Sequence, residues 1–148
     1  MEEKSTDSLM HILQSAHAED IDRYKETYLG DCCHSFPAYM DTLIREKALK
    51  RQDIFQRADL PWKYGYKLLS GETHTRDRDK LLRLFFAMKL NLKEVQRALA
   101  LYGMPALYPK NRRDAVLIIA FNRGVCSVDT VNEWLEQHGE AELTRSAE

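Results

Sequence analysis

The stretch PWKYGYKLLSG contains, within six residues, five side chains that could contact a large charged partner: Trp62, Lys63, Tyr64, Tyr66 and Lys67. In a helix the two lysines would share one face, where their charges could neutralise phosphate groups. The aromatic rings suit either the methyl group of thymine or the centre of a protein interface. Helical spacing places Tyr64 with Leu68 on another face, so Tyr64 is equally consistent with the core. The stretch has no Arg, Asn or Gln, the residues that normally form bidentate hydrogen bonds with base edges.

Charge is unevenly distributed along the 148 residues, although the formal net charge is only −1. Residues 1–44 contain 3 Lys/Arg and 9 Asp/Glu, a net charge of −6. Residues 45–113 contain 17 Lys/Arg and 7 Asp/Glu (net +10), and residues 114–148 contain 2 and 7 (net −5). A basic block between two acidic ones is typical of a chain in which one region contacts a polyanion. The alternative is that the basic helices only carry solvated charged faces.

The elements that must position these side chains are predicted to be helices throughout. Hydrophobic residues make up 44% of the chain and charged residues 30%, as in ordinary globular proteins. Apolar residues recur at helical spacing, and no segment shows the strict alternation of a strand. The predicted helices cover residues 6–17, 19–29, 35–49, 51–58, 62–69, 75–90, 91–103, 112–122 and 128–138.

The second half of the chain contains an internal repeat. Five positions recur 36 residues later in the sequence: Leu92, Val95, Leu99, Gly103 and Leu107 correspond to Val128, Val131, Leu135, Gly139 and Leu143. An apolar helix that opens on Asp79 or Asp114 precedes each copy, so the sequence predicts two helical hairpins that pack together. We therefore expect an acidic N-terminal extension (residues 1–34), a central domain (35–103) and a C-terminal helical hairpin packed on it (104–148).

Residues 39–99 contain sequence features in a characteristic order. A helix from about Tyr39 precedes Gln52, which opens a second helix; the third helix, a Ser-Gly stop with a polar loop, a leucine-rich helix and an LNLKEV opening follow. Over about residues 36–101 this order resembles the xenobiotic-response-element, or phage-repressor-like, helix-turn-helix family. The resemblance implies an all-α, lambda-repressor-like five-helix domain, flanked here by N-terminal short helices and the C-terminal hairpin. Its recognition helix would cover about residues 62–69.

The resemblance also implies a function, a bacterial or phage-type transcriptional regulator that binds double-stranded DNA. Such proteins bind as homodimers, because paired half-sites raise the affinity of a small unit. The resemblance implies base-facing roles for Trp62, Lys63, Tyr64, Tyr66 and Lys67. It also implies contacts of Gln52 with a phosphate and an adjacent base, and DNA-backbone contacts of four basic residues: Lys50, Arg51, Arg76 and Arg78.

Three positions depart from the family pattern, at Asp59, Pro61 and Gly65. Asp59 replaces the usual Gly of the turn and can adopt a left-handed conformation. Pro61 replaces the capping Ser or Thr, and a first-turn position tolerates its missing N–H. Gly65 replaces a branched apolar residue and lowers helix propensity by ~1 kcal/mol relative to Ala.

These departures leave a second function open, a protein-interaction adaptor or antitoxin-like module that keeps the fold without reading DNA. Trp62, Tyr64 and Tyr66 would then contact a protein partner, because interface centres are enriched in aromatic residues.

The remaining polar residues give no reason to expect an enzyme, a cofactor or a metal site. Cys32, Cys33 and His34 lack the ligand spacing of zinc sites, and no catalytic triad or glycine-rich phosphate loop is present. The longest apolar run, residues 115–121, is much shorter than the roughly 20 residues of a membrane helix. The three cysteines form no disulfide framework, so we expect a cytoplasmic protein.

Overall fold

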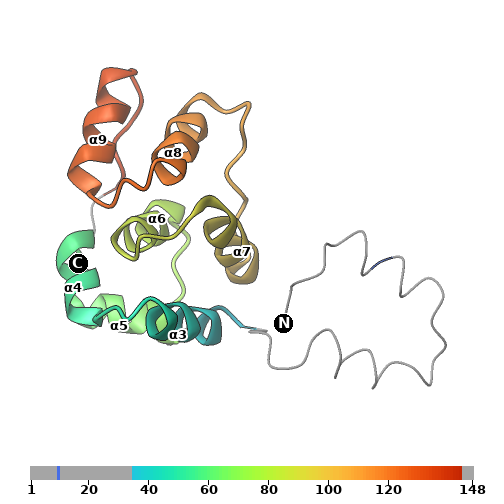
Figure 1. Cartoon of the computed structure of the whole chain (residues 1–148), viewed down its shortest axis with the longest axis vertical. Helices are drawn as coiled ribbons and strands as arrows, with labels where there is room; N and C mark the ends of the chain where they lie inside the picture. The colour runs from blue at the N-terminus through green and yellow to red at the C-terminus, as the bar shows by residue number, and fades with distance from the viewer. Residues whose placement is uncertain (1–9, 11–34, 145–148) are drawn as a thin grey trace. The chain divides into compact units, whose positions relative to one another are not determined.

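The computed structural model describes Met10 and residues 35–144, and the chain divides into two units between residues 33 and 34. Residues 35–144 form seven helices and no strand, which confirms the predicted all-α class for this part of the chain. The helices predicted over residues 6–17 and 19–29 lie outside the described residues. The helices are α3 (Phe36–Glu46), α4 (Arg51–Ala58), α5 (Trp62–Ser70), α6 (Arg78–Ala87), α7 (Leu92–Tyr102), α8 (Arg112–Asn122) and α9 (Val128–Gln137) (Figure 1).

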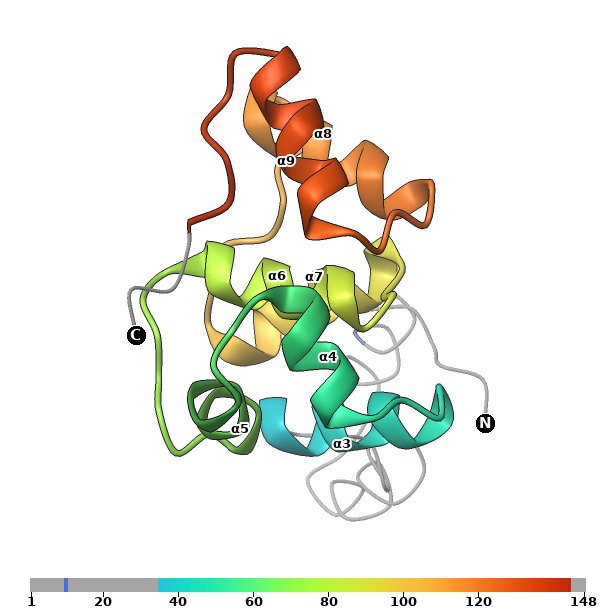
Figure 2. The same cartoon turned by 90° about the vertical axis from the view of Figure 1, so that its left-hand side faces the viewer.

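Helix α6 lies at the centre of residues 35–144. Figure 2 shows α3, α4 and α5 on one side of the α6–α7 pair, and α8 and α9 on the other. Seven consecutive residues of α6, positions 81–87, are buried, as expected for a helix that other elements surround. In the described part of the chain, no helix has both the length and the apolar character needed to cross a membrane.

Most of the described helices begin directly after a residue whose side chain caps the helix. The Ser35 hydroxyl accepts a hydrogen bond from the Ala38 N–H at 3.2 Å, and Asn91 and Glu94 form a capping box. Asn111 and Ser127 cap α8 and α9 in the same way. These side chains satisfy backbone N–H groups that have no partner within the helix, which fixes where each helix begins.

Helix α6 begins later than the sequence predicts, at Arg78 rather than at Thr75. The Thr75 hydroxyl accepts a hydrogen bond from the Asp77 N–H at 3.1 Å, and Asp77 in turn caps the helix by accepting from the Asp79 N–H. The Thr75 N–H donates to the Tyr102 phenol oxygen at 2.6 Å. Local side-chain hydrogen bonds of this kind compete with helical ones and delay the start of the helix.

The two predicted hairpins, α6–α7 and α8–α9, are joined by two equivalent ion pairs. Arg78 pairs with Asp114 at 2.5 Å, and Arg113, the repeat counterpart of Arg78, pairs with Asp79 at 2.8 Å. The rings of Phe86 and Phe121, which lie 35 residues apart in the sequence, stack with centroids 3.8 Å apart and planes within 3°. Equivalent groups of the two hairpins therefore contact each other, which supports the internal repeat.

A short segment follows each hairpin and is held by the same kind of contact. We call residues 104–108 the first strap and residues 140–144 the second strap. Gln96 of α7 exchanges two hydrogen bonds with the Leu107 backbone, at 2.8 and 2.9 Å. Its repeat counterpart, Asn132 of α9, accepts from the Leu143 N–H at 2.8 Å. Both straps are thus fixed to the second helix of their own hairpin.

We expect Asp79→Asn to make the fold less sensitive to acid. Burial alone would raise the pKa of Asp79, but hydrogen bonds from Arg113 and Thr144, with the charge of Arg113, lower it. A carboxylate with a lowered pKa in the folded state stabilises the fold above the pKa of the unfolded state, and this contribution is lost as the pH falls. Urea denaturation should show a loss of about 1–2 kcal/mol for Asp79→Asn at pH 7.

The difference from wild type should shrink as the pH falls below the ordinary pKa of an aspartate carboxyl, about 4, because the Asp79 carboxylate then becomes protonated. Asp129→Asn changes an exposed carboxylate of α9 and is the matched control, with no expected effect at pH 7. A difference between Asp79→Asn and wild type that stays constant over this pH range would contradict the prediction.

Candidate nucleic-acid interface

Helices α4 and α5 are joined by a tight turn at Asp59, which adopts a left-handed conformation with φ 55° and ψ 49°. This confirms the left-handed conformation expected for Asp59. The Leu60 N–H donates to the Phe55 carbonyl at 3.1 Å, and both Ala58 and Leu60 are buried where the helices meet. Pro61 is the residue directly before α5, as the predicted start of the helix at residue 62 requires, and its missing N–H leaves no helical hydrogen bond unmade.

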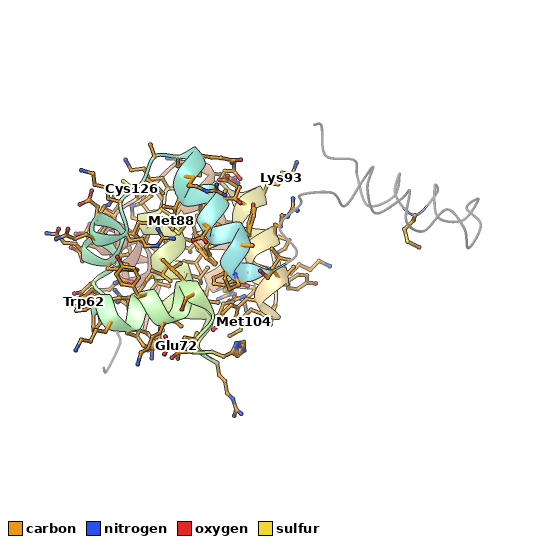
Figure 3. All side chains as sticks on the ribbon, turned by 90° about the horizontal axis from the view of Figure 1, so that it is seen from below. Trp62, Glu72, Met88, Lys93, Met104 and Cys126 are labelled. Atoms are coloured by element: carbon orange, nitrogen blue, oxygen red, sulfur yellow. The ribbon has the colours of Figure 1, made fainter. Side chains whose placement is uncertain are left out.

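Helix α5 has a buried side and a solvent side. Leu68 and Leu69 are buried against the core. On the solvent side Trp62 is 61% exposed and Tyr66 is 47% exposed. Lys63 and Lys67 are also exposed, and the helix contains no acidic residue. Figure 3 shows Trp62 at the edge of the molecule, on the opposite side from Lys93 of α7.

Gly65 is buried because the ring of Phe55 occupies the space where a side chain would lie. A Cβ atom added at Gly65 would stand 2.4 Å from a ring carbon of Phe55, far inside van der Waals contact. Phe55 of α4 is itself only 2% exposed and has little room to move. The space that a side chain at position 65 would need is therefore filled by a ring that enters from the neighbouring helix.

A column of three aromatic rings runs from the core to the first turn of α5. The rings of Phe55 and Tyr66 meet edge to face with centroids 5.1 Å apart. Tyr66 meets Trp62 in the same manner at 6.1 Å and an interplanar angle of 88°. The Lys63 Nζ lies 5.6 Å from the centre of the Trp62 ring, a cation–π distance. We call Phe55, Tyr66 and Trp62 the aromatic column.

Tyr64 differs from the other aromatic residues of α5, because it is half-buried. The Lys80 Nζ of α6 lies 5.1 Å from the centre of its ring. Tyr64 thus connects α5 to the first turns of α6, while Trp62 and Tyr66 face solvent.

The flanking residues singled out in the sequence fall into two groups. Lys50, Gln52 and Arg76 are exposed. Arg51 forms an ion pair with the exposed Asp41. The Arg78 guanidinium is held in one of the two ion pairs described above, and it also donates to two backbone carbonyls of the first strap.

Arg83, which the sequence analysis did not single out, connects the second strap to the end of α4. Its side chain is 2% exposed and donates to the Ala58 carbonyl at 3.1 Å, the Leu143 carbonyl at 3.0 Å and the Thr144 carbonyl at 2.8 Å. The signal in the sequence is a single cation inside the apolar run LLRLFF, where an arginine must find buried acceptors. Arg83 therefore fixes the residue that immediately precedes the α4–α5 turn.

No protein-family model, curated protein or solved structure matches this chain. Among the residues that the structure describes, no group of three or more His, Cys, Asp or Glu side chains could hold a metal ion. Cys32, Cys33 and His34 lie outside the described residues.

Proposed function

We propose that this protein is a bacterial or phage-type transcriptional regulator that binds double-stranded DNA, with α4 and α5 as the helix-turn-helix. One observation carries the proposal: the solvent side of α5 presents Trp62, Lys63, Tyr66 and Lys67 with no acidic residue in the helix. In such units the second helix enters the major groove and its first turns contact base edges. In this proposal α3–α7 form a lambda-repressor-like five-helix domain, and two copies bind paired half-sites.

The exposed basic residues at the edges of the helix pair support contacts with the DNA backbone. Lys50 stands at the start of α4, beside Gln52, where both side chains are exposed. Arg76 lies in the loop between α5 and α6. Arg51 can reach a phosphate by leaving its ion pair with Asp41, which costs little because exposed pairs contribute about 0–1 kcal/mol. We omit Arg78 from the proposed contacts, because its guanidinium already holds Asp114 and the first strap.

Fluorescence anisotropy with labelled duplex DNA across a salt series tests the proposal. Each neutralised phosphate should contribute about −0.9 to the slope of log K against log salt concentration. Titration at high DNA concentration gives the stoichiometry, and a dimer predicts two chains per site. Absence of binding even at low salt would reject the regulator.

Lys63→Ala and Lys67→Ala should each weaken DNA binding. Loss of one phosphate contact should reduce the magnitude of the salt slope by about 1 and weaken binding by several-fold at low salt. Lys93→Ala is the matched control, because it removes the same charge from an exposed lysine on the opposite side of the molecule (Figure 3). Equal losses for Lys67→Ala and Lys93→Ala would indicate that net charge, and not α5, determines binding.

The adaptor or antitoxin-like module is the second candidate, and the exposure of Trp62 and Tyr66 favours it. Large exposed aromatic side chains are frequent at the centres of protein interfaces. Under this alternative, Trp62→Ala would abolish capture of a stoichiometric protein partner, and the protein would not bind DNA at low salt. DNA binding without any such partner would count against the adaptor.

A further inference from the structure

We infer that Trp62 and Tyr66 recognise thymine methyl groups, so that the protein selects sites with A·T base pairs under the first turn of α5. This inference rests on the proposed DNA-binding function and names the chemistry that the same surface would read. It follows from what α5 contains, from how its rings are supported, and from what its lysines can and cannot distinguish.

Helix α5 has apolar rings where base-reading helices usually have amide or guanidinium groups. Its nine residues, WKYGYKLLS, include no Arg, Asn or Gln. In the major groove thymine presents a methyl group, which is read by apolar contact and not by hydrogen bonds. Trp62 is the first residue of α5 and is 61% exposed, so its ring stands at the end of the helix that would meet the bases. Tyr66 lies one turn further along the same side.

The aromatic column holds these rings in place before any partner binds. Phe55 is buried and supports Tyr66, and Tyr66 supports Trp62, through edge-to-face contacts of 5.1 and 6.1 Å. The absence of a side chain at Gly65 is what admits the Phe55 ring. Tyr and Trp have two side-chain torsions each, and a supported ring loses little conformational entropy on binding. The departure at Gly65 therefore creates the support for a surface that can read apolar groups.

The two lysines of this surface contribute attraction without much selectivity. Lys63 and Lys67 can each neutralise a phosphate, and phosphate contacts position a protein on DNA without reading its sequence. A lysine can also donate to guanine O6 and N7, but it cannot detect a thymine methyl group, which is read by apolar contact. The inference therefore assigns the preference for thymine to Trp62 and Tyr66.

The test begins with selection of bound sequences from a random duplex library, which identifies a preferred site. Each thymine of that site is then replaced singly by uracil, which lacks the C5 methyl group but pairs identically. Loss of contact with one methyl group should weaken binding about four-fold, which corresponds to ~0.8 kcal/mol. We expect this loss at one or two thymines of each half-site and no effect at the others.

Protein variants connect the methyl effect to the aromatic rings. In Trp62→Ala, thymine and uracil at a sensitive position should bind equally well. Tyr66→Phe keeps the ring and should keep the discrimination, whereas Tyr66→Ala should reduce it. Lys67→Ala should weaken binding to both DNAs by the same factor. Circular dichroism and thermal unfolding show whether each variant is folded. If Tyr66→Ala unfolds, Tyr66→Phe still tests whether the ring without its hydroxyl keeps the discrimination.

The outcomes separate this inference from the proposed function. Absence of DNA binding at low salt rejects both. A preferred site at which uracil substitution has no effect, or at which Trp62→Ala still discriminates, rejects methyl recognition and leaves the regulator intact. Salt-dependent binding with no preferred sequence also rejects methyl recognition, and it reduces the protein to a non-specific DNA binder.

Discussion

Replacing Arg83 by methionine should lower the free energy of unfolding by about 2–5 kcal/mol, because buried carbonyl oxygens would lose their donors. The Arg83 side chain donates to three backbone carbonyls, those of Ala58, Leu143 and Thr144. Methionine fills a similar volume but has no N–H group, and no water can easily replace a guanidinium at a residue that is 2% exposed. The loss would be a large part of the roughly 5–15 kcal/mol that stabilises a typical domain.

Urea denaturation of Arg83→Met and Arg83→Lys measures this contribution. Lysine keeps the charge but cannot direct donors to three separate acceptors, so Arg83→Lys should also be strongly destabilised. Lys93→Met is the matched control, since it makes the same cation-to-methionine change at an exposed position and should shift the stability by less than about 0.5 kcal/mol. A wild-type denaturation midpoint for Arg83→Met would show that its carbonyl acceptors find other donors.

The Arg83 contacts link two distant parts of the chain. Ala58 is the last residue of α4, directly before the turn that orients α5, and Leu143 and Thr144 belong to the second strap. The Asp79 carboxylate also accepts hydrogen bonds from the N–H and the hydroxyl of Thr144, at 3.0 and 2.9 Å. The second strap therefore does more than close the α8–α9 hairpin. Through Arg83 it stabilises the end of the helix on which the orientation of α5 depends.

Local signals in the sequence were sufficient for most of the described fold. Ser35, Asn91, Asn111 and Ser127 each satisfy backbone groups within a few residues, so their capping roles could be predicted without any tertiary contact. The apolar faces of the helices were equally readable, because burial follows the helical period. The start of α6 was placed wrongly because Asp77, and not Thr75, caps the helix, while the Thr75 N–H donates to Tyr102, 27 residues away.

The two ion pairs between the hairpins could not be predicted from the sequence. Arg78 and Arg113 are ordinary basic residues in sequence, next to Asp79 and Asp114, and helical charge patterning alone gives no reason to pair each with the more distant acid. The pairing depends on how the two hairpins meet, and it takes Arg78 out of the proposed DNA contacts. The repeat carried a usable hint, because an Arg-Asp dipeptide opens both hairpins.

The candidate site was predictable in its exposed residues but not in its support. Trp62, Lys63 and Lys67 could be placed on a solvent side by helical period, and the structure places them there. Gly65 was interpreted as the loss of an apolar anchor, whereas its position is filled by Phe55 from another helix. Such a replacement between elements leaves no local signal, because the ring and the space it fills are ten residues apart.

Gly65→Ala should therefore destabilise the protein, although alanine is the better helix former. The helix would gain ~1 kcal/mol of propensity, but the new Cβ would stand 2.4 Å from the Phe55 ring. Phe55 is buried, so we expect over-packing to cost about 3 kcal/mol, the upper end of its usual range, which leaves a net loss of about 2 kcal/mol after the gain in propensity. Thermal and urea denaturation measure it, with Lys63→Ala as the control for an exposed alanine in the same helix.

A double variant shows whether the space taken by the Phe55 ring is the cause. Phe55→Leu alone should destabilise the fold, because it leaves part of the ring volume empty. Combined with Gly65→Ala, the added methyl group should occupy some of that volume, so the double variant should be more stable than the sum of the two changes predicts. A coupling of about 0.5–3 kcal/mol is expected for residues in contact. Additive effects would mean that Gly65 does not admit the ring, and the supported surface on α5 would lose its structural basis.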